Sequence, residues 1–199
     1  MKKIKYIMLF ISILLLYCCD INMKFDKEDK NWVNIYKKED TLIFSSKKYR
    51  DTIHINYVEI KNANVDVMSS SYNPICANID YTDSTENTVN LFSICKEEPG
   101  IPTWVGFNFK KDKGRIRDIH SYPESELNFN GEKRKGYMFK PYKKDKPSFW
   151  WDEEYGVRNP HLEYFFWDRE YGIIEYKTIQ GEIFRLDKFL REGKNILQD

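Results

Sequence analysis

Short runs of alternating apolar and polar residues limit the fold of this chain more than any other feature. From Asp51 to Ile60, Ile53, Ile55 and Tyr57 fall on one face of an extended segment, and His54 falls on the other. A repeat of two residues is the spacing of a β-strand, in which successive side chains point to opposite faces of the sheet. We therefore expect a strand here, with His54 facing solvent.

Several further runs predict strands. The run from Val89 to Cys95 has apolar residues on both faces, which is typical of a strand at the centre of a sheet. Trp104 to Lys110 and Arg115 to Ile119 flank the sequence Asp112-Lys113-Gly114, which favours a hairpin turn. Near the C-terminus three runs predict a three-stranded meander: Leu162 to Trp167, Tyr171 to Lys177 and Glu182 to Leu186.

Composition agrees with a mainly β fold, because aromatic side chains, which are enriched in strands, make up 16% of the chain. We expect a single antiparallel sheet, built as a meander or a partly closed barrel or sandwich. Prolines that interrupt residues 121 to 160 permit long loops there, with short candidate strands at Glu126 to Phe129 and Gly136 to Phe139. Leu186, Phe189 and Leu190 have helical spacing, and Gly193 suits the position after a helix end, so a short C-terminal helix is also predicted.

The first eighteen residues have the layout of an export signal. Lys2, Lys3 and Lys5 give a cationic start, and Ile7 to Leu16 form an apolar run that only Ser12 interrupts. This run of ten residues is too short to span a bilayer, because a spanning helix needs about 20 apolar residues. We expect the segment to direct export and then to be removed.

The sequence Leu16-Tyr17-Cys18-Cys19 resembles the lipobox of bacterial lipoproteins that signal peptidase II cleaves. In that family an aliphatic, a variable and a small residue precede the cysteine that receives the lipid. With Cys19 lipidated, Leu16 takes the aliphatic position and Cys18 the small one. Cys18 is the less favoured choice, since the bulky Tyr17 would then take the small position. The resemblance implies diacylglycerol on the Cys19 sulfur, with fatty acyl chains such as palmitate, and a membrane anchor.

These features divide the chain into four parts. Residues 1 to 18 form the signal peptide, 19 to 31 a charged and solvated tether, 32 to 192 a β-rich domain, and 193 to 199 a C-terminal tail. The anchor implies a cell membrane or outer membrane location, facing the periplasm or the cell surface. The mature part also resembles the small, lysine- and asparagine-rich lipoproteins of Gram-negative envelopes.

Charge argues against a nucleic-acid partner. The residues before Cys19 carry three lysines and no acid, so the net charge of +1 for the whole chain becomes −2 for the mature part. Domains that bind nucleic acid normally carry a basic excess.

One local basic run does occur at Lys133-Arg134-Lys135, followed by Lys140, Lys143, Lys144 and Lys146, with Tyr137, Phe139 and Tyr142 between them. On an exported lipoprotein we interpret it as a solvated edge strand that lysines protect from aggregation. An acidic protein, an anionic lipid or a glycan is the alternative partner for this run.

The mature chain contains two cysteines, Cys76 and Cys95. An even pair in an oxidising compartment predicts a disulfide. Closing a loop of about 20 residues would contribute on the order of 3 kcal/mol to stability. Two independently buried thiols are the alternative.

The most unusual local sequence is a pair of tryptophans followed by three acids. These residues are Trp150, Trp151, Asp152, Glu153 and Glu154. Carboxylates that flank a sugar are the catalytic groups of glycosidases, and tryptophan rings stack on sugar faces. We interpret the five residues as a candidate ligand platform, with a loop whose rings pack on the sheet as the alternative.

No other pattern indicates chemistry. His54, His120 and His161 lie far apart without the spacing of a metal motif, and no Gly-x-Ser-x-Gly turn surrounds a nucleophile. We therefore assign no catalytic residue, no metal site and no cofactor, and the sequence makes no prediction of the oligomeric state.

The leading functional hypothesis is a lipid-anchored, non-catalytic envelope protein that binds a protein partner, of which toxin neutralisation by an immunity protein would be one form. Two alternatives stay open. One is a surface lipoprotein that binds or hydrolyses glycans through Trp150, Trp151 and the neighbouring carboxylates. The other is a structural component of an envelope assembly.

Overall fold

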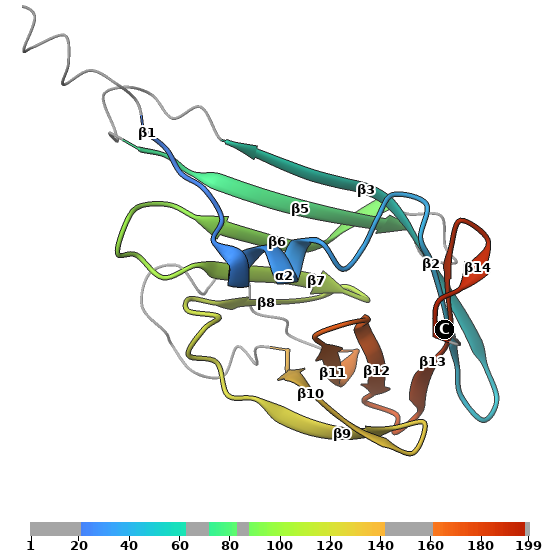
Figure 1. Ribbon diagram of the computed structural model, residues 1–199. Coiled ribbons are helices and arrows are strands. Elements are labelled where there is room, and N and C mark those ends of the chain that lie inside the picture. The colour runs from blue at the N-terminus through green and yellow to red at the C-terminus, as the bar shows by residue number, and fades with distance from the viewer. Residues whose placement is uncertain (1–20, 63–71, 83–87, 142–160, 198–199) are drawn as a thin grey trace, which may run out of the picture.

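The computed structural model describes residues 21–62, 72–82, 88–141 and 161–197. In these ranges the protein is mainly β, and eleven strands form one antiparallel sheet that curls into a half-barrel, with one short helix (Figure 1). The predicted single, partly closed antiparallel sheet is confirmed. Across the sheet the order is β8 (Asp112–Ile116), β7 (Trp104–Phe109), β6 (Thr88–Lys96), β5 (Ile75–Thr82), β3 (Arg50–Asn62), β2 (Thr41–Ser45), β13 (Ile183–Arg191), β12 (Gly172–Thr178), β11 (Leu162–Asp168), β10 (Glu132–Phe139) and β9 (Ser125–Phe129).

Three short strands and a helix complete the fold. Strand β1 (Ile21–Asn22) pairs in parallel with β4 (Tyr72–Asn73), and helix α2 (Lys27–Val33) follows β1. Strand β14 (Lys194–Asn195) pairs with β13. The segment expected as a C-terminal tail therefore begins with a strand, which corrects that prediction.

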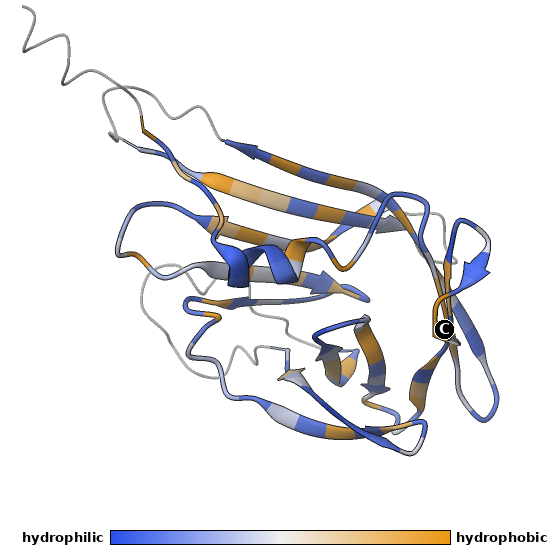
Figure 2. Cartoon of the chain, viewed as in Figure 1, coloured by the Kyte–Doolittle hydropathy of each residue, from blue (hydrophilic) through white to orange (hydrophobic). Residues whose placement is uncertain are grey.

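Alternation along the strands decides which side chains enter the core, as the striped colouring of Figure 2 shows. In β3, Ile53 and Ile55 are buried and His54 is exposed, as predicted. Tyr57, expected on the buried face, is 44% exposed. The register between β3 and β5 shifts between Ile55 and Tyr57, and such a bulge turns the following side chains to the other face.

Aromatic rings hold the two halves of the curl against each other. Phe107 and Phe109 on β7 contact Phe165 on β11 with ring centroids 5.0 and 5.5 Å apart. Phe109 also meets Tyr176 on β12 edge-on at 5.2 Å. Since β7 and β11 stand far apart in the sheet order, these contacts show that the sheet folds back on itself around a shared core.

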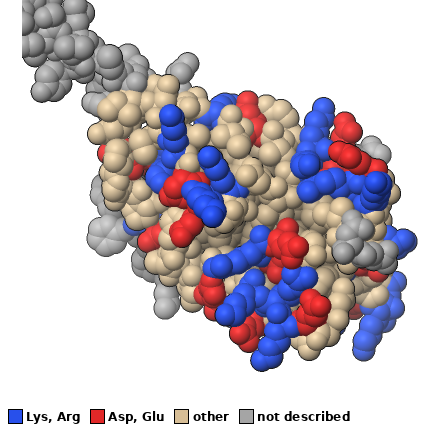
Figure 3. Space-filling view, viewed as in Figure 1, with Lys and Arg blue, Asp and Glu red and all other residues tan. Residues whose placement is uncertain are grey.

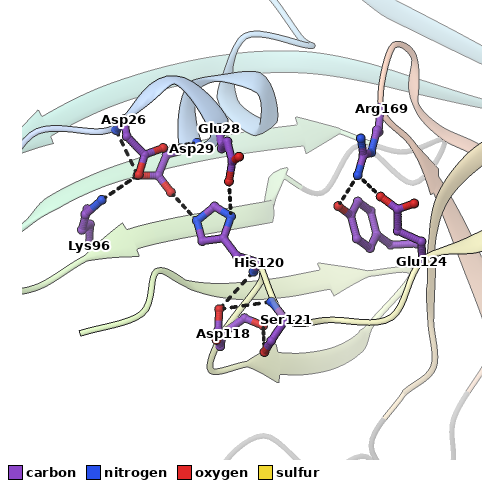
Figure 4. A network of polar contacts seen from close by, with 10 residues as sticks. Asp26, Glu28, Asp29, Lys96, Asp118, His120, Ser121, Glu124 and Arg169 are labelled. Carbon is purple, nitrogen blue, oxygen red and sulfur yellow. Dashed lines mark hydrogen bonds and ion pairs between the residues drawn. The ribbon is translucent and has the colours of Figure 1, made fainter. Parts of the chain in front are cut away.

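Strands β8 and β9 are the two edges of this sheet, although they are neighbours in the sequence. Residues 117–124 connect them and pass from one edge to the other beneath α2 (Figures 1 and 4). We call residues 117–124 the strap. It carries Ile119, which is fully buried, and His120, which reaches the helix.

The charged tether predicted for residues 19–31 is wrong from residue 21 onward. The side chain of Asp26 caps α2 by accepting a hydrogen bond from the backbone N–H of Asp29 at 2.9 Å. The side chain of Asp29 in turn accepts one from the backbone N–H of Asp26 at 3.1 Å. Such a reciprocal box satisfies two backbone donors that a helix start otherwise leaves unpaired. The charges that suggested a solvated segment therefore build a helix start, and Trp32, the first residue of the expected β-rich domain, lies within α2.

The predicted C-terminal helix is also wrong, because Leu186, Phe189 and Leu190 lie in β13. Leu186 pairs with Phe44 of β2, and Lys188 pairs with Ile43, the residue before Phe44. Asp187 is therefore an extra residue in the ladder. A bulge of this kind lets two residues three apart face the same side. Leu186 and Phe189 are both buried for this reason, and their spacing imitates a helix.

The C-terminal meander is confirmed, since β11, β12 and β13 pair in succession. The β7–β8 hairpin is confirmed too, but its turn lies two residues earlier than predicted. Lys110 and Lys111 have φ values of +52° and +71°, as a two-residue turn between twisted strands requires. Asp112 is instead a buried residue of β8.

Candidate binding site

A cavity of about 560 Å³ opens between helix α2, the strap and strands β10 and β11. We call it the α2 cleft. Its volume lies within the ~300–1,000 Å³ that is typical of ligand sites. Aromatic and charged residues share its lining: Glu28, Trp32, His120, Tyr122, Glu124, Tyr137, Trp167, Arg169, Glu170 and Arg191.

The side chain of Trp32 fixes the position of helix α2 on the sheet. Its ring stacks on Phe92 of β6 and on Trp167 of β11, with centroids 5.8 Å away in each case, and Tyr137 lies 4.7 Å away. Phe92 and Trp167 stack directly at 4.5 Å. One side chain of α2 thus bridges strands from both halves of the curl, and the cleft floor is built from rings whose faces already contact other rings.

Asp29 organises the polar contacts beneath the helix (Figure 4). Its carboxylate is fully buried and lies 3.2 Å from the Lys96 ammonium of β6 and 3.0 Å from His120 Nε2 of the strap. Lys96 also lies 2.9 Å from Asp26. A buried carboxylate needs such partners because its desolvation is costly. The network therefore ties the helix to β6 and to the strap.

His120 stands between two carboxylates of α2. Its Nδ1 lies 3.2 Å from Glu28 Oε2, and its Nε2 lies 3.0 Å from Asp29 Oδ1. Both ring nitrogens thus lie within hydrogen-bonding distance of carboxylates on α2. The imidazole therefore joins the strap to the helix.

Asp26, Asp29 and His120 bring three potential metal-ligand atoms within 4.8 Å of one another. Lys96 already supplies a positive charge to both carboxylates at hydrogen-bonding distance. The backbone N–H of Asp29, with the hydrogen bond from Lys96, lowers the pKa of Asp26 from the ordinary 3.8 to about 2. We interpret the cluster as an ion-pair network that fixes α2, and we assign no metal to it.

Arg169 forms the opposite wall of the cleft (Figure 4). Its guanidinium pairs with Glu124 at the end of the strap and donates to the Tyr137 hydroxyl at 3.2 Å. Burial raises the pKa of Tyr137 above its ordinary value, so the hydroxyl stays protonated. Glu170, beside Arg169, pairs with Arg134 at 2.7 Å.

Arg191 closes one end of the cleft from β13. It donates to both oxygens of Asp40 at 2.9 and 2.6 Å and to the carbonyl of Ile35 at 2.7 Å. Asp40 is buried, and this bidentate bond raises the pKa of Arg191 above its ordinary value. The chain after α2 is therefore fixed to the C-terminal strand.

The surface around these groups carries mixed charge. Figure 3 shows acidic and basic side chains intermingled on the face in view. Arg134 of the predicted basic run pairs with Glu170 and Glu132 and lies over the Tyr171 ring, and Lys133 pairs with Glu126. Lys133 and Arg134 are thus balanced by acids. Lys133 to Lys135 lie in β10, beside the edge strand β9, which corrects the expectation that this run forms the edge strand itself.

The predicted disulfide is confirmed. Cys76 of β5 and Cys95 of β6 are direct partners in the ladder, their Cα atoms lie 4.2 Å apart, and the two sulfurs are bonded. The bridge joins the third and fourth strands from the β8 edge of the sheet.

Other sequence-predicted site residues lie outside the described residues: Cys18, Cys19, Trp150, Trp151, Asp152, Glu153 and Glu154. The three histidines occupy separate environments. His54 contacts Thr41 Oγ1 at 3.1 Å on the surface, His161 contacts Asp112 at 3.3 Å, and His120 lies in the α2 cleft.

The sequence did not identify the α2 cleft, whose lining comes from residues as distant as Glu28, His120 and Arg169. One available pattern was overlooked. Asp26 and Asp29, spaced as in a capping box and followed by buried Trp32 and Val33, are typical of a helix start.

In the ranges that the structure describes, no helix has the length and apolar character to cross a bilayer. Comparisons of the chain with protein families, with curated proteins and with solved structures found no match.

Proposed function

We propose that this chain is a lipid-anchored protein of the bacterial cell envelope that binds a protein partner, without catalysis, at the α2 cleft. Neutralisation of an incoming toxin is one biological form that such binding would take. The partner presents an apolar side chain to the aromatic floor and polar groups to the charged rim.

The composition of the cleft lining carries this proposal. Tryptophan, tyrosine and arginine dominate the hot spots of protein interfaces, and Trp32, Tyr122, Tyr137, Arg169 and Arg191 all line the cleft. Both arginines are held by carboxylates, so they are already oriented before a partner arrives. Preorganised side chains lose less entropy on binding, which supports a binding role for this surface.

The lipobox sequence supports the anchor. With Cys19 lipidated, Asp20 alone lies between the lipid and strand β1. Such a short connection would hold the folded domain close to the membrane surface.

The glycan hypothesis rests on Trp150, Trp151 and the acids after them, which lie outside the described residues, and it stays a prediction. In the α2 cleft the faces of Trp32 and Trp167 are covered by neighbouring rings. Sugar-stacking sites offer an open ring face, so the cleft itself favours a protein partner over a glycan. A structural role in an envelope assembly is a second form of the same binding.

Site-specific photo-crosslinking in intact cells tests the binding surface. A photoreactive amino acid replaces Asn31 or Asn34, which are exposed at the cleft, and Asn128, an exposed residue of β9, serves as the matched control. We expect an adduct of one defined mass from the first two positions and none from Asn128. Equal adducts at all three positions, or no adduct at the cleft, would contradict the proposed site.

Mass spectrometry of the mature N-terminus tests the anchor independently. We expect acylated Cys19 as the first residue, and we expect Cys19→Ala to abolish both the acyl mass and membrane association. Retention of the first eighteen residues without acylation would overturn the anchor but leave the crosslinking result standing.

A further inference from the structure

A second cavity, of about 410 Å³, lies at the end of the sheet where the loop before β3 and the β7–β8 turn approach β11 and β12. We call it the basic cavity. It shares no lining residue with the α2 cleft. Its floor is aromatic, since Tyr176 and Phe184 stack with centroids 4.8 Å apart and planes inclined by 8°. Tyr49 stands at its rim and is 63% exposed.

Cationic groups dominate the rim of the basic cavity. Arg50, Lys110 and Lys111 line it together with His161, against a single carboxylate in the lining, Asp51. An excess of one charge around a low-dielectric floor attracts ligands of the opposite charge.

The single carboxylate is already compensated. Asp51 lies 2.7 Å from the Lys110 ammonium and accepts a hydrogen bond of 2.5 Å from the Tyr176 hydroxyl. Both Asp51 and Tyr176 are buried, so this pair of bonds belongs to the floor. Asp51 is therefore not positioned to neutralise the other cations.

The other basic residues of the lining are available to a ligand. Among the described residues Lys111 forms no ion pair, and its positive φ fixes it at the tip of the turn. Arg50 pairs with Asp187 at 3.2 Å, but both side chains are about half exposed, and such surface pairs contribute little. His161 is held at the rim by Asp112, which accepts its backbone N–H at 2.9 and 3.0 Å.

We propose that the basic cavity binds a small organic anion, a carboxylate attached to an aromatic body. The ring lies against Tyr176 and Phe184, and the carboxylate meets Lys111 and Arg50. Apolar contact with this pair of rings and charge-assisted hydrogen bonds supply the two parts of the recognition. The volume lies within the range of small-molecule sites.

The position of the cavity indicates that the ligand comes from solution. Strand β3 begins at Arg50 beside the cavity and ends at Asn62, whose side-chain amide donates to the Met23 carbonyl just after β1 (Figure 1). Thirteen strand residues span about 40 Å. With the anchor proposed above, the cavity lies at the far end of β3 from the lipid attachment, which favours a ligand from solution over a headgroup of the same membrane.

Three probes with one ring body test the proposal on the full chain in neutral detergent micelles, with empty micelles as the blank: 2-naphthoate, 2-naphthamide and 2-naphthylmethylamine. Titration calorimetry at low salt should show saturable binding of the carboxylate, at least about tenfold weaker binding of the amide, and none of the amine. Nuclear Overhauser contacts should join the naphthyl protons to the rings of Tyr176 and Phe184.

Lys111→Gln should weaken 2-naphthoate binding about tenfold, whereas Lys113→Gln, an equal charge change on an exposed residue of β8 outside the cavity, should not. Equal affinity for carboxylate and amide, an equal loss in both variants, or no saturable binding would overturn the proposal. None of these results bears on the crosslinks at Asn31 and Asn34. The proposals for the basic cavity and for the α2 cleft are therefore tested independently.

Discussion

The α2 cleft and the basic cavity both join aromatic rings to charged groups, but they differ in how those charges are compensated. In the cleft the charges of Asp29, Arg169 and Arg191 each have a partner inside the protein. In the cavity Lys111 forms no ion pair among the described residues, and Arg50 has a weak one. Groups that the fold itself uses should affect stability when they are removed, whereas unused groups should affect binding and leave stability unchanged.

The two regions should differ most in stability when one aromatic ring is removed from each. Trp32→Ala should lower the free energy of unfolding by about 3–5 kcal/mol, because it deletes the ring that joins β6 to β11. Tyr49→Ala should cost less than about 0.5 kcal/mol, because that ring is 63% exposed. Chemical denaturation of the full chain measures both, and equal losses would contradict the distinction.

Removing the buried charge of the cleft should have the next largest effect. Asp29→Asn leaves Lys96 with the exposed Asp26 as its ion-pair partner, so we expect a loss of about 3 kcal/mol. The matched control is Glu28→Gln, whose side chain is 77% exposed and should change stability by less than about 0.5 kcal/mol. A loss below 1 kcal/mol for Asp29→Asn would show that the network does not hold α2.

Acid should weaken the cleft in a defined pH window. The pKa of Asp26 is about 2 in the folded protein and 3.8 ordinarily, so its stabilisation is complete above pH 4 and disappears as the pH falls toward 2. The side chain is 51% exposed, and after allowance for solvent screening we expect a loss of about 1 kcal/mol.

Asp26→Asn keeps a good capping residue and removes this titration. The difference between the two proteins should therefore shrink as the pH drops through the window. A difference that stays constant from pH 5 to pH 2 would contradict the assignment.

The smallest effect is expected from the cation at the rim of the cavity. Arg50→Gln should change the free energy of unfolding by no more than about 0.5 kcal/mol, because its pair with Asp187 is exposed. The same variant should weaken 2-naphthoate binding severalfold. A loss of unfolding free energy well above this value would show that Arg50 stabilises the fold, as the paired charges of the α2 cleft do.

Much of the fold followed from the sequence, because strand alternation and the pairing of successive strands in hairpins are local patterns. The strands around Ile53 and Val89, the C-terminal meander and the Cys76–Cys95 bridge all appear as predicted. The failures have local causes too. Asp187 adds a residue to β13 and so produces helical spacing in a strand, and the charges of Asp26 and Asp29 serve as helix caps.

The candidate site was harder to predict, because it depends on contacts between distant segments. His120 on the strap meets Asp29 on α2, and Arg169 after β11 meets Glu124 at the far end of the strap. The two residues of each pair lie far apart in the sequence, and neither pair belongs to a sequence motif. Only the curl of the sheet brings them together.

The strap also limits how far the half-barrel can open. Hydrogen bonding along the ladder fixes the neighbours of each strand, but β8 and β9 have no ladder between them, and residues 117–124 are the length of chain that spans their separation. The aromatic contacts across the core close the curl from inside, and this short loop bounds its aperture from outside.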